Sequence, residues 1–331
     1  MYPVLRIVSA ALLACAMAAS APVAAQPSQS AANYPSKSLR LLVPSAPGGG
    51  TDIIARLIAQ GLFESWGHSV VVDNRGGGGG IPAVTLVAKH AAPDGYTLLL
   101  GSVGHLTFAP AIERNLAYDP RRDLAPISLA ANQPFVIAAT RTLAANTIQE
   151  LITLAKAKPG TISYGSGGSG SASHLGIELL AINTGFSMLH VAYKGSNPAV
   201  TAAMAGEIHI ALAGLATLLP HVKGNRLKAL AVTSAKRTHF APDIPAVAES
   251  VPGYVFDVWY GLVYPGGTPR AIVAKASSEI HKLLASAEVG KRFANAGVEP
   301  MTNTPEAFSA MIAQEIPKWQ KVVREAKIKV E

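Results

Sequence analysis

The sequence contains a single cysteine and few charged or aromatic side chains. Cys15 is the only thiol among 331 residues, so the chain cannot close an intramolecular disulfide. Charged residues make up 15% and aromatic residues 6% of the chain, and the basic residues behind the formal net charge of +8 are scattered singly or in pairs. Nucleic-acid-binding surfaces need such residues in clusters. We therefore predict a compact globular protein that binds no nucleic acid.

Motifs for metal ions, cofactors and covalent catalysis are also missing. The nine histidines show no spacing typical of metal ligands, and the sequence has no Gly-x-Ser-x-Gly motif. Gly165, Gly167 and Gly170 match the dinucleotide-binding pattern, but no acidic residue follows about 20 positions later. The sequence therefore predicts neither a metal site nor a cofactor.

The only long apolar run lies at the N-terminus. A basic residue precedes an apolar stretch over residues 7–19, and small residues follow it up to Ala25. This pattern is typical of a secretory signal peptide, and the stretch is too short to span a bilayer. We predict a signal peptide over residues 1–25, a disordered segment over residues 26–33 and a mature protein in the periplasm. A faint lipoprotein-like pattern leaves open whether Cys15 carries a lipid.

A glycine-rich corner over residues 45–52 connects a predicted buried strand (39–43) with a predicted amphipathic helix (53–63). Glycine has no Cβ, so a ligand can approach this backbone closely. The first N–H groups of a helix are unpaired and lie at the positive end of its dipole, and Thr51 is the predicted N-cap. The corner predicts a phosphate or carboxylate site, with Asp52 stabilising the helix dipole. The alternative is a tight turn without a ligand.

A second corner of the same kind follows about 120 residues later. Residues 162–164 form a predicted strand, residues 165–174 are rich in glycine and serine, and residues 175–182 form a predicted helix. A run of five glycines at residues 76–80, here called the pentaglycine run, is a predicted loop because glycine loses the most backbone entropy on ordering. Two anion-friendly corners in separate halves of the chain would hold a small dicarboxylate between them.

The order of predicted elements indicates an α/β protein with two lobes. An early β-α-β-α-β rhythm predicts a parallel sheet with helices on both faces. After an extended segment at residues 127–140, a self-contained block repeats the rhythm, and the C-terminal helices then resume it. We predict a first lobe from residues 34–130 and 255–331 and a second from 131–254, joined by two chain crossings.

Several motifs between residue 34 and the C-terminus match one family. They are Tyr34-Pro35, Val43-Pro44-x-x-Pro47-Gly48-Gly49-x-Thr51-Asp52-x-x-Ala55-Arg56, Asn74-Arg75, Pro93-Asp94-Gly95-Tyr96-Thr97-Leu98, Tyr118-Asp119-Pro120, Tyr164-Gly165-Ser166, Tyr193-Lys194-Gly195, Leu230-Ala231-Val232-Thr233-Ser234 and Gly267-Thr268-Pro269. On these motifs the sequence resembles the Bug family, the periplasmic solute receptors of tripartite tricarboxylate transporters. The resemblance implies a Venus-flytrap (type II periplasmic-binding-protein) fold. It also implies that a carboxylated solute binds between the lobes and passes to an integral membrane permease.

We expect a monomeric receptor that is not an enzyme. The predicted ligand-binding residues are Pro47, Gly48, Gly49, Gly50, Thr51, Asp52, Ser102, His105, Ser166, Gly167, Ser169, Ser171, His174, Tyr193 and Gly214. The sequence departs from the family where acidic residues are usual, at Thr201 and His209, and also at Gly76-Gly77 and Ala109-Pro110. These departures leave the identity of the solute open.

Two other functions stay compatible with the sequence. A periplasmic hydrolase could use Ser102, Ser169 or Ser171 with His105 or His174, because these residues flank the glycine-rich corners. A solute sensor that presents its ligand to a membrane kinase would use the same cleft as a transport receptor. The sequence alone does not separate the transport receptor from the sensor.

Overall fold

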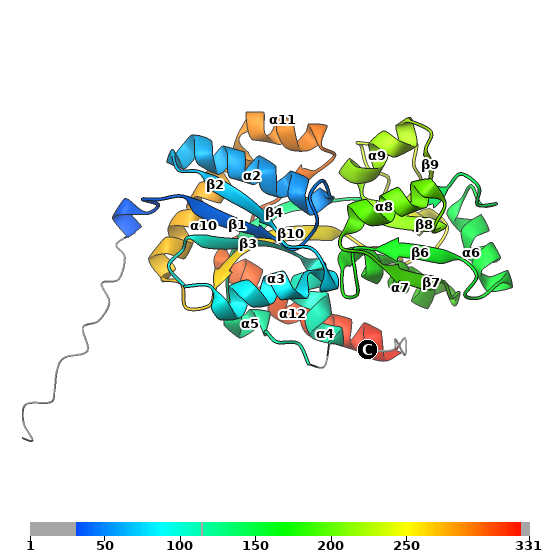
Figure 1. Cartoon of the computed structure of the whole chain (residues 1–331), viewed down its shortest axis with the longest axis horizontal. Coiled ribbons are helices and arrows are strands. Elements are labelled where there is room, and N and C mark those ends of the chain that lie inside the picture. The colour runs from blue at the N-terminus through cyan, green and yellow to red at the C-terminus, as the bar shows by residue number, and fades with distance from the viewer. Residues whose placement is uncertain (1–30, 114, 326–331) are drawn as a thin grey trace, which may run out of the picture.

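The computed structural model describes residues 31–113 and 115–325, which form two α/β lobes side by side (Figure 1). The predicted signal peptide lies outside the described residues. Within the segment predicted to be disordered, Ala31–Asn33 instead form a short 3₁₀ helix, η1. In the part of the chain that the structure describes, no helix combines the length and apolar character needed to cross a membrane.

The first lobe is built on a six-stranded mixed sheet. Its order is β11 (Glu299–Pro300), β4 (Leu124–Gln133), β10 (Val258–Pro265), β3 (Thr97–Ser102), β1 (Leu39–Val43) and β2 (Val70–Asn74). Strands β2, β1 and β3 are parallel, as the βαβ rhythm predicts, whereas β10 is antiparallel to both β3 and β4. The predicted parallel arrangement is found for β1, β2 and β3, and the sheet as a whole is mixed because β4 and β10 come from the two segments that pass between the lobes.

The second lobe is built on a five-stranded mixed sheet. Its order is β7 (Leu189–Ala192), β6 (Ser163–Ser166), β8 (Ile210–Gly214), β5 (Phe135–Thr140) and β9 (Leu227–Val232). Strand β6 is parallel to β7 and β8, and β5 is antiparallel to β8 and β9. The two sheets thus share one plan, in which a parallel group is extended by an antiparallel strand next to the crossing.

Helices cover both sheets (Figure 1). The longer ones are α2 (Gly50–Trp66), α6 (Ile148–Ala157), α7 (Ala172–Thr184), α8 (Ser196–Ala205), α9 (Leu215–Lys223), α10 (Arg270–Ala285), α11 (Ala287–Asn295) and α12 (Pro305–Glu325). The shorter ones are η2 (Gly78–Gly80), α3 (Ile81–Thr85), η3 (Leu86–His90), η4 (Gly104–Phe108), α4 (Ala109–Ile112), α5 (Pro120–Asp123) and η5 (Val247–Glu249).

The chain passes between the lobes twice, so the predicted two-lobed fold with two crossings is confirmed. The first crossing joins β4 to β5 through Pro134, and the second joins β9 to β10. Strand β4 continues three residues beyond the predicted boundary at residue 130, and β10 begins at Val258, close to the predicted boundary at residue 255. The division of the chain into lobes at these residues stays a prediction.

Two helix starts differ from the sequence predictions. Helix α2 begins at Gly50 rather than at residue 53, and its N-cap is Gly49, which has no side chain to bond the first turn. Thr51 is therefore the second helical residue and not the N-cap. Helix α7 begins at Ala172, and the hydroxyl of its N-cap Ser171 accepts a hydrogen bond from the backbone N–H of His174. Both helices start inside the glycine-rich corners, so their first N–H groups belong to the corners.

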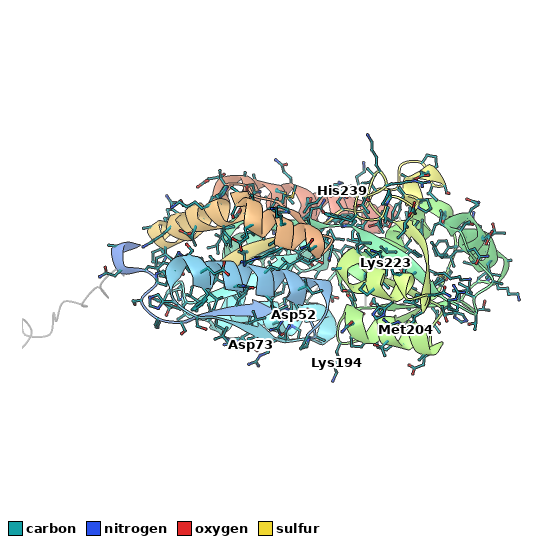
Figure 2. All side chains as sticks on the ribbon, turned by 90° about the horizontal axis from the view of Figure 1, so that it is seen from above. Asp52, Asp73, Lys194, Met204, Lys223 and His239 are labelled. Atoms are coloured by element: carbon teal, nitrogen blue, oxygen red, sulfur yellow. The ribbon has the colours of Figure 1, made fainter. Side chains whose placement is uncertain are left out.

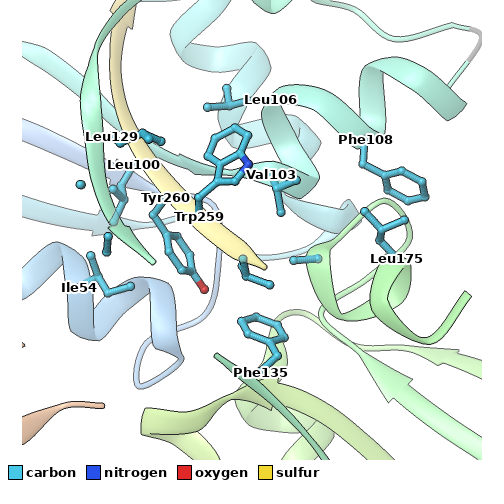
Figure 3. Packing of buried hydrophobic residues seen from close by; sticks show 14 of the residues in the cluster. Ile54, Leu100, Val103, Leu106, Phe108, Leu129, Phe135, Leu175, Trp259 and Tyr260 are labelled. Atoms are coloured by element: carbon cyan, nitrogen blue, oxygen red, sulfur yellow. The ribbon is translucent and has the colours of Figure 1, made fainter. Parts of the chain in front are cut away.

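The last helix of the chain packs on the first-lobe sheet. Phe308 of α12 is fully buried, and its ring makes an edge contact with Trp259 of β10 at a centroid distance of 5.6 Å. Gly261 leaves the space that the Phe308 ring occupies, because a Cβ at this position would overlap the ring. Figure 3 shows Tyr260 of β10 directed toward Phe135 of β5, where the two lobes meet, whereas Trp259 lies nearer to Leu106. The C-terminal helix thus completes the core that begins with β1.

We expect Phe308→Ala to lower the free energy of unfolding by about 3–5 kcal/mol, because it removes a buried aromatic side chain and leaves a cavity. Urea titration followed by circular dichroism measures this loss. Phe63→Ala is the matched control, since Phe63 lies on α2 and is 54% exposed. Equal midpoints for the two variants would show that α12 does not contribute to the first-lobe core.

Candidate functional site

A small cavity lies between the lobes. Its volume is about 40 Å³, which is room for roughly three water molecules. The lining residues are Pro44, Ser45, Gly50, Thr51, Gly79, Ser102, His105, Phe135, Gly167, Ser171, Ala172, Ser173, Gly195, Ser196, Gly214 and Tyr260. They come from both lobes, so the structure shows the lobes closed on each other.

Four helices begin at the wall of this cavity. Helix α2 comes from the first lobe, and α7, α8 and α9 come from the second. The lining residues at these helix starts are Gly50, Thr51, Ser171, Ala172, Ser173, Gly195, Ser196 and Gly214. The first N–H groups of each helix lack a partner within the helix and carry the positive end of its dipole. Among the described residues, no lysine, arginine or carboxylate lines the cavity. Backbone dipoles therefore make the cavity suited to an anion.

The first-lobe corner is fixed by Asp52, which does not line the cavity. Its Oδ2 accepts hydrogen bonds of 2.9 Å from the N–H of Gly48 and from Nε of Arg56. Burial alone would raise the pKa of Asp52, but the bonds from Arg56 and Gly48 outweigh it and lower the pKa below its usual value. Figure 2 shows Asp52 at the end of the first lobe that faces the second. Asp52 thus holds the turn that presents Gly50 and Thr51.

The serines of the second-lobe corner have different roles. Ser173 Oγ accepts a hydrogen bond from the N–H of Gly167 at 2.8 Å and lies 3.1 Å from Ser171 Oγ, so both hydroxyls border the cavity. Ser166 is fully buried, and its Oγ accepts from the N–H of Gly168 at 3.0 Å. Ser166 therefore shapes the loop, whereas Ser171 and Ser173 face the site.

His174 belongs to a stack of aromatic rings under the second-lobe corner. Its ring centroid lies 4.2 Å from that of His190, which in turn lies 4.9 Å from that of Tyr164. The Nδ1 atom of His174 accepts a hydrogen bond from the N–H of Gly170 at 3.3 Å, and burial lowers its pKa to about 4. His174 therefore supports the loop as a neutral side chain and does not border the cavity.

Ser102 and His105 form the one Ser–His pair that borders the cavity in the described part of the chain. Ser102 Oγ lies 3.0 Å from His105 Nδ1, which also accepts the backbone N–H of Ser102 at 3.2 Å. Burial lowers the pKa of His105 to about 4. A hydrogen bond between the ring and the backbone of Gly79 opposes this decrease, which is the effect expected when a carbonyl accepts the ring N–H. The ring thus carries its proton on Nε2 and is neutral at pH 7.

Gln133 fills the space between helix starts of the two lobes. Its side chain is fully buried at the end of β4, and its Oε1 accepts a hydrogen bond of 3.4 Å from the hydroxyl of Tyr260. A Cβ at Gly50 or at Gly214 would overlap the Gln133 side chain. Both positions therefore need glycine in this closed arrangement.

Seven of the fifteen predicted ligand-binding residues line the cavity. They are Gly50, Thr51, Ser102, His105, Gly167, Ser171 and Gly214. The other eight do not line it; they are Pro47, Gly48, Gly49, Asp52, Ser166, Ser169, His174 and Tyr193. Gly48, Ser166 and Ser169 shape the two corners whose other residues line the cavity. Pro47 and Tyr193 border a separate outer groove.

Nine lining residues were not predicted. They are Pro44, Ser45, Gly79, Phe135, Ala172, Ser173, Gly195, Ser196 and Tyr260. Ser45, Ala172 and Ser173 lie inside the two glycine-rich corners, and Gly195 ends the motif Tyr193-Lys194-Gly195, so the local signal was present but these residues were not selected from it. Phe135 and Tyr260 face the cavity because the two crossings run behind it, which a sequence motif does not reveal.

Thr201 and His209, which stand where the family usually has acidic residues, lie away from the cavity. The Thr201 hydroxyl donates to the carbonyl of Asn197 within α8 and borders the outer groove, and His209 Nδ1 lies 2.9 Å from Ser163 Oγ. Neither side chain lines the cavity. Thr201 and His209 therefore do not change the lining of the cavity itself.

Two lobes joined by two crossings, with an anion-suited cavity between them, define a solute-binding receptor. The sequence matches the family described as "Tripartite tricarboxylate transporter family receptor" over residues 54–328. The chain belongs to this family, and its predicted resemblance to the Bug proteins is confirmed.

Solved structures of related proteins have the same fold. The periplasmic binding protein BugD is 33% identical, with a TM-score of 0.85 over 89% of this chain and 99% of BugD. Rpa4515 from R. palustris, solved with adipate, is 34% identical, with a TM-score of 0.84 over 89% of this chain and 98% of its own. MatC from Rhodopseudomonas palustris, solved with malate, is 29% identical, with a TM-score of 0.83 over 88% of this chain and 100% of its own.

The buried histidines predict how stability depends on pH. The pKa of His105 falls from 6.5 to about 4 on folding, so the unfolded chain binds the proton more tightly. The neutral ring of His105 therefore contributes about 3 kcal/mol to the free energy of unfolding above pH 6.5, and this contribution is lost as the pH falls toward 4. We expect His105→Gln to lessen the fall in unfolding free energy between pH 6.5 and 4. Urea titrations at several pH values measure this, with exposed His90→Gln as the control. Parallel curves for parent and His105→Gln would contradict the burial of a neutral ring.

Proposed function

We propose that this protein is an extracytoplasmic receptor that captures a small carboxylate between its lobes and delivers it to a tripartite tricarboxylate-type membrane permease. The observation that carries the proposal is the cavity into which α2, α7, α8 and α9 all direct their N-termini. The positive ends of the helix dipoles favour an anion, and the serine and threonine hydroxyls beside them supply further donors. The fold and the family support the same class of function.

The distribution of donors requires closure for tight binding. One helix start comes from the first lobe and three come from the second, so neither lobe alone surrounds the ligand. Each hydrogen bond to a charged group contributes roughly 1.5–3 kcal/mol net. Loss of either half of the site therefore removes several kcal/mol of binding free energy, and the open receptor binds weakly.

The cavity size limits the solute. A volume of about 40 Å³ is smaller than a dicarboxylate, so the lobes open slightly to admit one. MatC and Rpa4515 were solved with malate and adipate, respectively. Among carboxylates we propose the shorter dicarboxylates for this chain, because each added methylene requires further separation of the lobes.

We infer that the Ser102–His105 pair does not hydrolyse the solute. The distance of 3.0 Å meets the requirement for a nucleophile and its base. However, the base would become a buried imidazolium, and no carboxylate among the described residues is bonded to the ring to stabilise it. The low pKa of about 4 reflects the same cost. Receptor function without catalysis therefore fits the site better than hydrolysis does.

The cellular setting follows from the same proposal. The predicted signal peptide at residues 1–25 would direct the protein to the periplasm, where BugD is described as a binding protein. The family description supports a permease of the tripartite type as the partner. We propose a monomer with lobes over residues 34–130 plus 255–331 and 131–254.

Binding of a dicarboxylate should be visible as thermal stabilisation. A ligand at 100 times its dissociation constant stabilises the folded protein by about 2.7 kcal/mol. We expect malate or a similar short dicarboxylate to raise the melting temperature, adipate to raise it less, and malamide, which has neutral amides in place of both carboxylates, to leave it unchanged. Equal stabilisation by malate and malamide would contradict recognition of the charge.

Thr51→Val tests the first-lobe corner. Thr51 lines the cavity and shares a side-chain hydrogen bond with Tyr260, so the variant removes a hydroxyl at nearly constant volume. We expect calorimetry with the best dicarboxylate to show about ten-fold weaker binding, corresponding to the loss of about 1.4 kcal/mol. Thr153→Val on the exposed face of α6 is the control. Unchanged affinity in Thr51→Val would place the site elsewhere.

A further inference from the structure

The pentaglycine run lies where the first lobe touches the second. Gly77, Gly78, Gly79 and Gly80 have φ angles of 106°, 54°, 62° and 85°, which is the left-handed region that favours glycine. Gly79 also lines the cavity. Four consecutive residues with left-handed backbone angles fold the pentaglycine run into a compact turn, and the backbone of this turn faces the second lobe.

The contact across the cleft is made by backbone against backbone. A Cβ at Gly79 would overlap the carbonyl oxygen of Ser169 in the second lobe. From the other side, a Cβ at Gly168 would lie 2.6 Å from the N atom of Gly79. No side chain larger than hydrogen fits at either position while the lobes are closed.

Neighbouring contacts between the lobes have the same character. A Cβ at Gly76 would lie 2.6 Å from the carbonyl oxygen of Lys194, and a Cβ at Gly104 would lie 2.7 Å from the N atom of Ala172. Figure 2 shows Lys194 at the junction of the lobes, with its side chain directed away from the molecule. Closure thus brings main-chain segments together and keeps long side chains outside.

His105 connects this contact with the wall of the cavity. Nδ1 of the ring accepts the N–H of Ser102, and the other ring nitrogen faces the pentaglycine run, since a Cβ at Gly80 would lie 2.5 Å from Nε2. The ring also hydrogen-bonds to the backbone of Gly79. The hydroxyl of Tyr118 fixes the backbone of His105 by donating to its carbonyl at 2.7 Å. The neutral ring therefore bridges the end of β3 and the pentaglycine run.

We propose that His105 is a positioning residue that holds Gly79 where its backbone meets Gly168 and Ser169, so that lobe closure depends on this glycine contact. The inference rests on the proposed receptor function, because closure matters to a protein that encloses a solute. It assigns the pentaglycine run to closure rather than to direct solute binding. His105 acts by holding Gly79 in place, and the expected effect is on how readily the two lobes close.

An introduced cysteine pair measures closure without any solute. A Cβ at Gly170 of the second lobe would lie 3.5 Å from the Cβ of Ala109 in the first, which is within the range of a disulfide. Cys15 is the only natural cysteine, so Cys15→Ser with Ala109→Cys and Gly170→Cys gives a single pair of thiols. The rate of disulfide formation under mild oxidation then reports how often the lobes close.

Gly79→Ala in this background tests the contact. We expect cross-linking to slow by at least about ten-fold, because the added methyl group blocks the closed state. Gly67→Ala is the matched control, since Gly67 has a similar φ of 69° and nothing within 4 Å of an added Cβ. Equal cross-linking rates in the two variants would overturn the proposed contact. Melting curves from circular dichroism compare the stabilities of the two variants, since both place alanine at a similar positive φ.

Two substitutions of His105 test its positioning role. His105→Leu keeps the size of the ring but loses both nitrogen atoms, and we expect slow cross-linking similar to that of Gly79→Ala. His105→Gln keeps a donor that reaches Gly79, and we expect it to restore most of the rate, a rescue that a purely space-filling role would not produce. Parent-like cross-linking in His105→Leu would overturn the proposal. Absence of binding to malate and adipate in the parent protein, measured separately by calorimetry, would instead contradict the proposed function.

Discussion

The four helix starts that meet at the cavity are the constraint on which the rest of this structure depends. They can act together only if two lobes bring α2 of the first lobe against α7, α8 and α9 of the second. The two crossings provide that geometry, and the mixed sheets follow from it, because the crossing strands β4, β5 and β10 join their sheets antiparallel to neighbours. Under the proposed function, main-chain dipoles would take the place of the cationic side chains that are absent from the lining of the described cavity.

Close packing within the closed protein explains four of the glycines near the cleft. Gly50 and Gly214 leave room for the buried side chain of Gln133 at the first crossing, and Gly79 and Gly168 leave room for each other across the cleft. In each case a Cβ would meet another group of the closed protein rather than open space. Glycine is used here mainly for proximity between parts of the chain, and at Gly79 its left-handed backbone is needed as well.

Much of the fold could be predicted from the sequence, because hydrophobic runs and glycine-rich turns are local signals. Strand β1 begins and ends where predicted, and the predicted extended segment at residues 127–140 contains the first crossing. Helix α9 was missed because Pro220 and a short length obscure its periodicity. In the site, Gly50, Thr51 and Ser171 were predicted from helix starts, whereas Phe135 and Tyr260 come from crossings that meet only in three dimensions. Asp52 was placed at the ligand, but its hydrogen bonds to Gly48 and Arg56 make it a support for the turn.

The main-chain character of the cavity has a consequence for how the protein can diverge. Nineteen of the twenty amino acids carry a backbone N–H, so nearly any substitution at a helix start keeps the donor, and only proline removes it. Side chains around the donors, such as those of Phe135, Tyr260 and Ser102, can change while the main-chain N–H groups stay in place. Under the proposed function, selection for a new solute would therefore act on the shape and depth of the cavity, and the main-chain recognition of a carboxylate would be inherited with the fold.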